Sequence, residues 1–454
     1  MAEVYFLSKR TVASTKVVQL GKFCSLSVLD RIMEPCNLRI VFYYRFPAKY
    51  EVGIVTKKLG DSLSETLSNF EIVTGRLQRS REGQWMIKCN DAGVRMAEAR
   101  AKGSVEEWLQ TVDNEKELKL IYWEDMFHKP YYWSTFYVQV TEFEGGGLAI
   151  GLSCTHLLAD AECATMLIKA WADTTLTGNM LTPPLYHPLP PRRIGNNHKP
   201  YTELISHYKS TLEKINPIST SPTYNYATVT LAFNDNMAQS TGALDNSSPS
   251  PFAALAGLFW VCISKVKGKR EGLVNMTVCL DMRKELGLDK GFFGNCMVFN
   301  KVCGEGLKEI GVVKAASVIS DVVGKMSNEG NILDLIEWLE SKSNKDGNDK
   351  SHRSPPPPIN GPDLVFANWE KLDPYSATFE EGVEPIRVSY YLEPLYGEGQ
   401  VLILASPKDE DDEGCLSRVA MVTLPQDQAV KLCEDALIRR FSPTILMGVK
   451  KNYA

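Results

Sequence analysis

The sequence lacks the features that would place it among membrane, secreted or nucleic-acid-binding proteins. No window approaches the roughly 18 uncharged apolar residues that a membrane span requires, and residues 1–10 do not show the order of charged, apolar and small residues that marks a secretory signal. Lysine and arginine number 50 against 55 aspartate and glutamate, for a formal net charge of −5, whereas phosphate binding needs a basic surface. We therefore expect a cytoplasmic protein with no membrane span and no nucleic-acid partner.

Paired cysteines and clustered metal ligands are also missing. The eleven cysteines occur singly with no CxxC pair, and the six histidines do not cluster with cysteines or carboxylates at zinc spacing. An odd number of scattered thiols suits a reducing compartment better than a disulfide framework. We expect no metal site and no permanently bound cofactor.

The composition that is present suits a folded protein of two domains. The 454 residues exceed one ordinary domain and fit two of about 200 residues each, and 44% hydrophobic with 23% charged residues is a globular balance. A proline-rich stretch at 186–222 predicts a crossover linker between domains at 1–185 and 223–454, and residues 341–362 predict a flexible polar excursion. We predict an α/β fold in two similar domains, each a mixed sheet flanked by helices, with a ligand channel between them.

Local residue patterns predict the elements of these domains. Runs of β-branched and aromatic residues indicate strands, and apolar residues at helical spacing indicate helices. The predicted strands are 38–44, 134–141, 148–154, 274–280, 387–392, 400–405 and 418–424, and the predicted helices are 55–70, a helix from 161, 201–215 and 251–266.

His156 lies in the predicted turn between the strand at 148–154 and the helix that starts at Ala161. A loop at a strand end is where a rigid scaffold presents reactive groups. Histidine has an unperturbed pKa of about 6.5, so it can accept a proton near neutral pH from an alcohol or amine that attacks an acyl carbon. Asp160 is able to cap the following helix or to accept an ion pair that fixes the turn. We predict His156 as a general base, with Asp160 shaping its loop.

A covalent nucleophile is not evident next to His156. Ser153 and Cys154 fall within the preceding strand, and no Gly-x-Ser-x-Gly elbow is present there. The sequence therefore predicts direct transfer from an activated donor to an acceptor, without an acyl-enzyme.

Five segments in order resemble the BAHD family of plant acyltransferases over nearly the whole chain. The HxxxD segment around His156 is weak alone, because any histidine with aspartate four residues later satisfies it. The resemblance is carried by Leu26-Ser-Val-Leu-Asp30, by Lys58-Leu-Gly-Asp-Ser-Leu-Ser64 with Thr74-Gly-Arg-Leu77, by Gly151-Leu-Ser-Cys-Thr-His156-Leu-Leu-Ala-Asp160, by residues 251–263 with Trp260, and by Asp281-Met-Arg283 followed by Gly291-Phe-Phe-Gly-Asn295.

This resemblance implies two chloramphenicol-acetyltransferase-like domains with a channel in which acyl-CoA, as co-substrate, meets a small-molecule alcohol or amine acceptor. It implies that Asp160 turns from the substrate and pairs with Arg283. It further implies Trp369 and Asn368 as candidates for the oxyanion or channel wall. The residues it assigns to the acyl-CoA site are Arg283, Gly294, Asn295, Phe379 and Gly382.

The family's second signature, Asp-Phe-Gly-Trp-Gly, is degraded in this chain. Its place is taken by Thr378-Phe-Glu-Glu-Gly382, in which only Phe379 and Gly382 match. Two carboxylates near a CoA polyphosphate would repel it. The change keeps open an alternative function, because the family's eceriferum-type wax subgroup also lacks this signature.

In that alternative the protein is a non-catalytic accessory that modulates a very-long-chain fatty acid elongase by contact with its condensing enzyme. Retention of Gly291-Phe-Phe-Gly-Asn295 argues for an active acyltransferase instead. A peptide-synthetase condensation domain is a more distant third reading, since such domains usually carry a second histidine where this chain has Thr155.

Overall fold

The computed structural model describes most of the chain. The described ranges are 4–46, 53–192, 201–213, 225–234, 249–307, 310–343, 363–407 and 418–449, except for single positions 18, 20, 82, 127 and 396 and for residues 269–271. Residues 344–362 of the predicted excursion, and residues 193–200 and 214–222 of the predicted crossover, lie outside these ranges.

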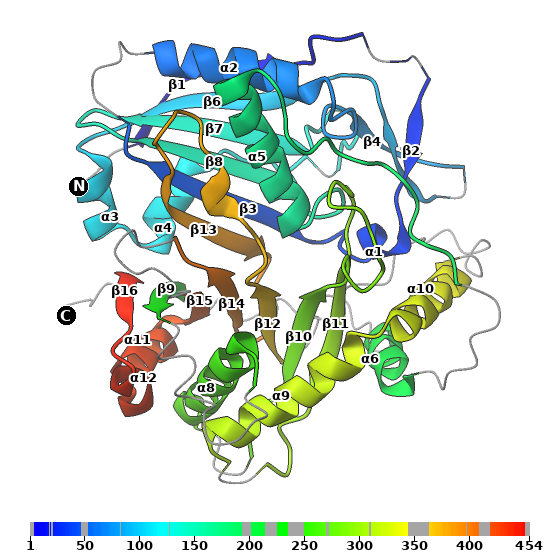
Figure 1. Ribbon diagram of the computed structural model, residues 1–454, viewed down its shortest axis with the longest axis vertical. Helices are drawn as coiled ribbons and strands as arrows, with labels where there is room; N and C mark the ends of the chain where they lie inside the picture. The colour runs from blue at the N-terminus through cyan, green and yellow to red at the C-terminus, as the bar shows by residue number, and fades with distance from the viewer. Residues whose placement is uncertain are drawn as a thin grey trace.

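The upper layer in Figure 1 is built on a six-stranded mixed sheet. Its order is β1-β6-β7-β8-β3-β13, antiparallel except for the β6–β7 pair. The strands are β1 (Val4–Val12), β3 (Asn37–Tyr44), β6 (Val94–Ala101), β7 (Phe136–Phe143), β8 (Leu148–Thr155) and β13 (Pro385–Glu393). Helices α2 (Ile54–Leu67) and α5 (Ala161–Thr177) pack together over this sheet (Figure 1).

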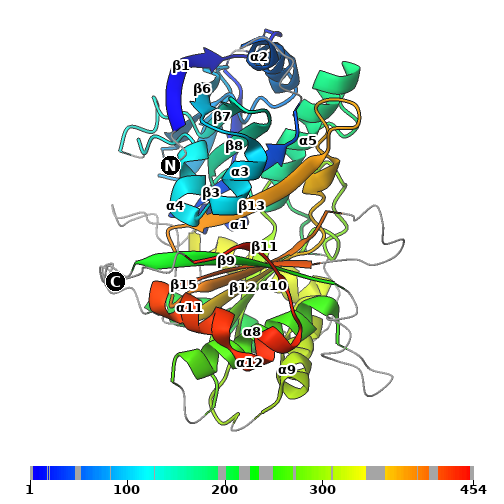
Figure 2. The same cartoon turned by 90° about the vertical axis from the view of Figure 1, so that its left-hand side faces the viewer.

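The lower layer contains a seven-stranded mixed sheet with most of its helices on one side (Figure 2). The order is β11-β10-β12-β14-β15-β9-β16. The strands are β9 (Tyr226–Phe233), β10 (Met276–Asp281), β11 (Met297–Val302), β12 (Leu364–Trp369), β14 (Gln400–Ala405), β15 (Arg418–Pro425) and β16 (Thr444–Met447), and the helices are α6 (Thr202–Glu213), α8 (Pro251–Val266), α9 (Val312–Met326), α10 (Glu329–Ser343), α11 (Gln426–Glu434) and α12 (Ala436–Arg440).

A small three-stranded sheet and several short helices complete the first half. The sheet has the order β2-β5-β4, and its strand β2 is followed directly by α1. These elements are β2 (Phe23–Ser25), α1 (Val28–Arg31), β4 (Arg76–Arg79), β5 (Trp85–Lys88), α3 (Val105–Thr111) and α4 (Asn114–Glu117).

Capping chemistry fixes the helices that matter for the site. The Asp160 side chain accepts from the N–H of Cys163 at the start of α5, and Gly178, whose φ of 77° is left-handed, caps the end of α5 after Thr177. Helix α8 begins at Pro251 after the Ser250 cap, so its start coincides with the predicted one. These local signals explain why the pattern of the sequence placed both helices correctly.

Strand β13 joins the two layers. It comes from the second half of the sequence, yet it pairs antiparallel with β3 of the first sheet over Pro385 to Glu393. Arg387 on this strand donates to the carbonyl of Leu446 in β16 at 3.0 Å, and it lies 3.3 Å from buried Glu117. A division of the chain at 186–222 therefore leaves one strand of the first sheet in the second segment.

The structure confirms the predicted α/β class with two sheet-containing domains. The strands expected at 38–44, 148–154 and 400–405 are β3, β8 and β14. Within the described residues, no helix combines the length and apolar character needed to cross a membrane.

Candidate active site

His156 is held at the end of β8, in the turn that leads to α5. Its backbone N–H donates to the carbonyl of Cys36 at 2.9 Å, which ties the turn to the chain just before β3. Its side chain is 1% exposed. Burial lowers the pKa of His156, although Asp160 and Asn295 oppose that change. The imidazole is therefore neutral at neutral pH, as a proton acceptor must be.

The nitrogen Nδ1 of His156 faces a residue of the other domain. It lies 2.8 Å from Oδ1 of Asn295, which precedes β11. The Asn295 amide nitrogen donates back to the carbonyl of His156 at 2.9 Å. The two contacts fix the imidazole ring across the domain boundary.

Asp160, which is fully buried, forms an ion pair with Arg283, which is nearly so. Its Oδ1 lies 2.9 Å from Nη2 of Arg283, and its oxygens also accept from the backbone N–H groups of Cys163 at 3.0 Å and Cys296 at 3.1 Å. Burial acts to raise the pKa of Asp160, but the Arg283 guanidinium outweighs it and the pKa is lowered overall. The carboxylate is thus ionised, and it joins α5 to the loop before β11.

Arg283 has further partners in its own domain. Nη1 lies 2.5 Å from Oδ2 of Asp281, and Nη2 donates to the carbonyl of Gly294 at 2.6 Å. Because the guanidinium has a planar fork of donors, it can serve these groups and Asp160 together. Arg283 consequently positions the backbone next to Asn295.

The loop that carries Gly294 and Asn295 rests on the segment after α5. Leu185 donates to the carbonyl of Gly291 at 2.7 Å, and Phe293 donates to that of Leu185 at 3.0 Å. A Cβ at Gly291 would lie 2.5 Å from the carbonyl oxygen of Pro183, so only glycine allows this close approach. This contact explains the glycine at the start of the motif.

Trp369 is the last residue of β12. Leu280 of the parallel strand β10 pairs with Asn368, so Trp369 lies at the same end of the sheet as Asp281, which pairs with Arg283. The Trp369 ring packs edge-on against Tyr390, whose hydroxyl lies 2.8 Å from that of Thr165 on α5. Among the described residues the buried indole Nε1 of Trp369 has no hydrogen-bond partner. Its N–H is therefore a buried donor without a protein acceptor in the described part of the chain.

Phe379 and Gly382 lie apart from these residues. The Phe379 ring packs edge-on against Tyr44 and Trp171, with ring centroids 5.7 and 4.9 Å away. Tyr44 is at the opposite end of β3 from Asn37, which pairs with Thr155 beside His156. At ~3.3 Å per residue, that separation is roughly 23 Å along the strand.

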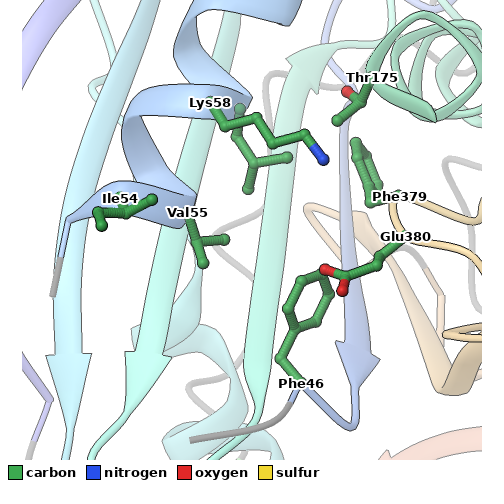
Figure 3. A pocket seen from close by; sticks show the side chains of 8 residues that line it. Phe46, Ile54, Val55, Lys58, Thr175, Phe379 and Glu380 are labelled. Atoms are coloured by element: carbon green, nitrogen blue, oxygen red, sulfur yellow. The ribbon is translucent and has the colours of Figure 1, made fainter. Parts of the chain in front are cut away.

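A cavity of about 190 Å³ opens beside Phe379. Figure 3 shows Lys58 of α2 and Glu380 of the degraded segment on its walls, together with Phe46, Val55 and Phe379. The cavity is at the Tyr44 end of β3, so it is separate from the residues around His156. The structure thus brings together His156, Asp160, Arg283, Gly294 and Asn295, and it places Phe379 and Gly382 elsewhere.

Two functional candidates were missed by sequence reasoning. Asp30 accepts from the Asn295 backbone and amide nitrogens, both at 2.8 Å. Its segment carries part of the family resemblance, but nothing in the sequence indicated that it would reach the second domain. Glu162, two residues after Asp160, is mostly buried, and burial raises the pKa of its carboxyl to about 7.

Glu162→Gln tests the consequence of that raised pKa. A carboxyl that binds its proton more tightly when folded loses stability as pH rises from its unfolded pKa of about 4.3 to its folded value. We expect the variant to gain stability relative to the wild type across that window, by roughly 1–3 kcal/mol. Urea unfolding at several pH values measures it, with the exposed Glu381→Gln as matched control; parallel curves for all three proteins would contradict the assignment.

The fold and this site define an acyltransferase-type protein of two sheet-containing domains. The chain belongs to the Transferase family, the BAHD acyltransferases, whose family model matches residues 2–437. It is similar to the Arabidopsis thaliana protein ECERIFERUM 26, with 25% identity over 94% of this chain and 93% of that one. It is also similar to shikimate O-hydroxycinnamoyltransferase of Nicotiana tabacum, with 22% identity over 85% of this chain and 90% of that one.

Solved structures share the fold. Vinorine synthase aligns with a TM-score of 0.68 and 16% identity, over 99% of both chains. TRI101 of F. sporotrichioides, solved with coenzyme A and T-2, aligns with a TM-score of 0.66 and 14% identity, over 94% of this chain and 100% of that one.

Proposed function

We propose that this protein transfers an acyl group from acyl-CoA to a hydroxyl or amine of a plant metabolite in the cytoplasm. The observation that carries the proposal is the buried, neutral His156, fixed through Nδ1 on Asn295. Nε2 would take the acceptor proton as the acceptor oxygen or nitrogen attacks the thioester carbonyl. The new bond to the acyl carbon forms, the C–S bond breaks, and the proton passes from His156 to the departing CoA thiolate.

The groups near His156 support direct transfer. The Ser153 hydroxyl donates to the carbonyl of Tyr122 at 2.6 Å, and burial raises the pKa of the Cys154 thiol, so neither resembles an activated nucleophile. The unpartnered indole N–H of Trp369 is suited to the developing oxyanion. Asn368 precedes it in β12, so its side chain points to the other face of the sheet, where its oxygen accepts from the N–H of Glu370 at 3.2 Å. We therefore favour Trp369 over Asn368 as the oxyanion donor.

The residues assigned to acyl-CoA divide into two groups. Arg283, Gly294 and Asn295 are engaged with protein partners, so we propose that they build the wall of the acyl-CoA channel. Phe379 and Gly382, at the far end of β3, would contribute to CoA binding only at a distance from the thioester. Structural relatives solved with coenzyme A, such as TRI101, support the co-substrate class.

A second function rests on the similarity to ECERIFERUM 26 and on the degraded signature. In it the protein modulates a fatty acid elongase condensing enzyme by contact and needs no turnover. Glu381 and Gly382 are exposed, so this part of the surface is accessible to a partner.

A panel of acyl-CoA donors against alcohol and amine acceptors distinguishes the two functions. We expect the purified protein to form an ester or amide and to release CoA thiol in equal amount. Thiol release without acylated product would indicate hydrolysis alone. Two results together would contradict the enzymatic function and favour the accessory function. The first is no transfer across the panel, and the second is that a His156→Ala protein still restores wax formation in a plant that lacks the wild-type protein.

A further inference from the structure

Three residues from separate parts of the chain form a continuous hydrogen-bonded row that ends on His156. Asp30 comes from the N-terminal helix α1, Asn295 from the loop before β11, and His156 from the turn after β8. Oδ1 of Asp30 lies 2.8 Å from Nδ2 of Asn295, and Oδ1 of Asn295 lies 2.8 Å from Nδ1 of His156. All three side chains are buried.

The orientation of the Asn295 amide follows from its neighbours. A primary amide has two N–H donors on nitrogen and only acceptor positions on oxygen. The two groups facing Nδ2 are the Asp30 carboxylate and the carbonyl oxygen of His156, both of which only accept. The amide oxygen must therefore face the histidine ring, and the ring nitrogen opposite it must be the one that carries hydrogen.

That hydrogen determines which nitrogen of His156 can act as a base. In a neutral imidazole one ring nitrogen carries hydrogen and the other has a lone pair. With hydrogen on Nδ1, the lone pair is on Nε2. If the Asn295 amide turned over, its N–H₂ would face Nδ1, the ring would place its hydrogen on Nε2, and that nitrogen could no longer accept a proton.

We infer that Asp30 is a positioning residue, which fixes the Asn295 amide and thereby holds His156 in the tautomer with hydrogen on Nδ1. The role in catalysis rests on the proposed function, whereas the tautomer can be observed without any substrate. Asp30 acts through Asn295.

The geometry of Asp30 separates this role from ordinary helix capping. Its Oδ2 accepts from the backbone N–H of Ser27 at 2.7 Å, and its own N–H donates to the Ser27 hydroxyl, which together make the capping box of α1. Oδ1 is left over from that box and accepts twice from Asn295. Burial raises the pKa of Asp30, and the hydrogen bonds from Asn295 and Ser27 oppose the rise. The N–H groups of Ser27 and Asn295 point at its two oxygens, so both oxygens act as acceptors in these contacts.

Histidine nitrogen spectroscopy tests the inference on the full chain. Protein labelled with ¹⁵N-histidine gives separate signals for ring nitrogens with and without hydrogen, and His156→Gln identifies the signals of His156 among the six histidines. We expect the wild type to show hydrogen on Nδ1. In Asp30→Ala, the Asn295 amide loses its charged acceptor, so we expect His156 to show a mixture of tautomers or the opposite one.

Matched variants distinguish the contact of Asp30 with Asn295 from the part that Asp30 plays in the capping box of α1. Ser27→Ala weakens the cap but leaves Oδ1 of Asp30 on Asn295, so its tautomer should be that of the wild type. Asp30→Asn can still offer a carbonyl oxygen to Asn295 and should retain much of the wild-type signal. Glu107→Gln alters the remote capping box of α3, in which Glu107 accepts from the Ser104 N–H at 3.0 Å, and should change nothing at His156.

The outcomes decide between the role and a purely structural one. If Asp30→Ala keeps the wild-type tautomer while Asn295→Ala loses it, Asp30 is only a cap and the inference fails. If Asp30→Ala does not fold, Asp30→Ser replaces it in the same tautomer measurement, because the serine hydroxyl does not extend as far as the carboxylate oxygens. For a transfer reaction found in the panel, Asp30→Ala should lower kcat roughly 10- to 100-fold with little change in KM. The tautomer of His156 can be measured even in a protein without turnover, so failure of the proposed function can be told apart from failure of this inference.

Discussion

Acyl transfer by the His156→Ala protein is expected to be about 10²- to 10⁴-fold slower than by the wild type, the range that a positioned general base contributes. The reason is local: the ring is held in one orientation by Asn295, and among the described residues around it neither Ser153 nor Cys154 is placed to replace it. The loss should appear in kcat, since alanine removes a proton acceptor used in the transition state.

Because His156 is buried, the alanine variant must be shown to fold before its activity is interpreted. Circular dichroism and thermal unfolding provide that control, and His128→Ala, at an exposed position, should retain full activity. Turnover of the folded His156→Ala protein within a few-fold of the wild type would show that the base is elsewhere.

Arg283→Met should destabilise the protein by about 3–5 kcal/mol, because it leaves the Asp160 carboxylate buried without its cation. Asp160 is fully buried, and Arg283 is its ion-pair partner at 2.9 Å. The variant also removes the donor to the Gly294 carbonyl, so the loop carrying Asn295 should loosen. Denaturant unfolding measures the loss.

The double variant Arg283→Met with Asp160→Asn should recover part of that stability, because the remaining buried group is neutral. The exposed pair of Arg45 and Glu106 gives the comparison: Arg45→Met should cost less than about 1 kcal/mol. Equal losses at the two sites would refute the buried ion pair as a main support of the turn.

The pH dependence of the same loss has a definite sign. The folded pKa of Asp160 is lowered, so its ionised form contributes stability above the unfolded pKa of about 3.9. That contribution disappears as pH falls through the folded pKa. The difference between wild type and Arg283→Met should therefore be largest near neutral pH and shrink in acid.

Local patterns predicted most elements of the fold because their causes are local. The change from strand to helical periodicity placed His156 in a turn, and the apolar spacing within residues 251–266 placed α8. The pairing of β13 with β3 could not be predicted in this way, since a strand's apolar residues do not say which sheet it completes.

The residues of the candidate site also fall into those that a local pattern indicates and those that it does not. His156, Asp160 and Arg283 could be named from motif positions, and the structure brings them together. The contact between Asp30 and Asn295 spans 265 positions of sequence, so no local pattern indicates it. Phe379 could be aligned with a signature, but its place beside Tyr44 depends on how the segment before β13 packs.

The path of β13 also sets an order on the synthesis of the protein. The ribosome completes β3, β8 and the His156 turn long before it reaches Glu393, so until then the growing chain holds a sheet whose β3 edge has no neighbour. Unpaired backbone N–H and C=O groups at such an edge attract other chains. A nascent or shortened chain that ends near residue 185 would therefore keep His156 and yet be prone to association. The first sheet becomes complete only after β9, β10, β11 and β12 of the second sheet have been made.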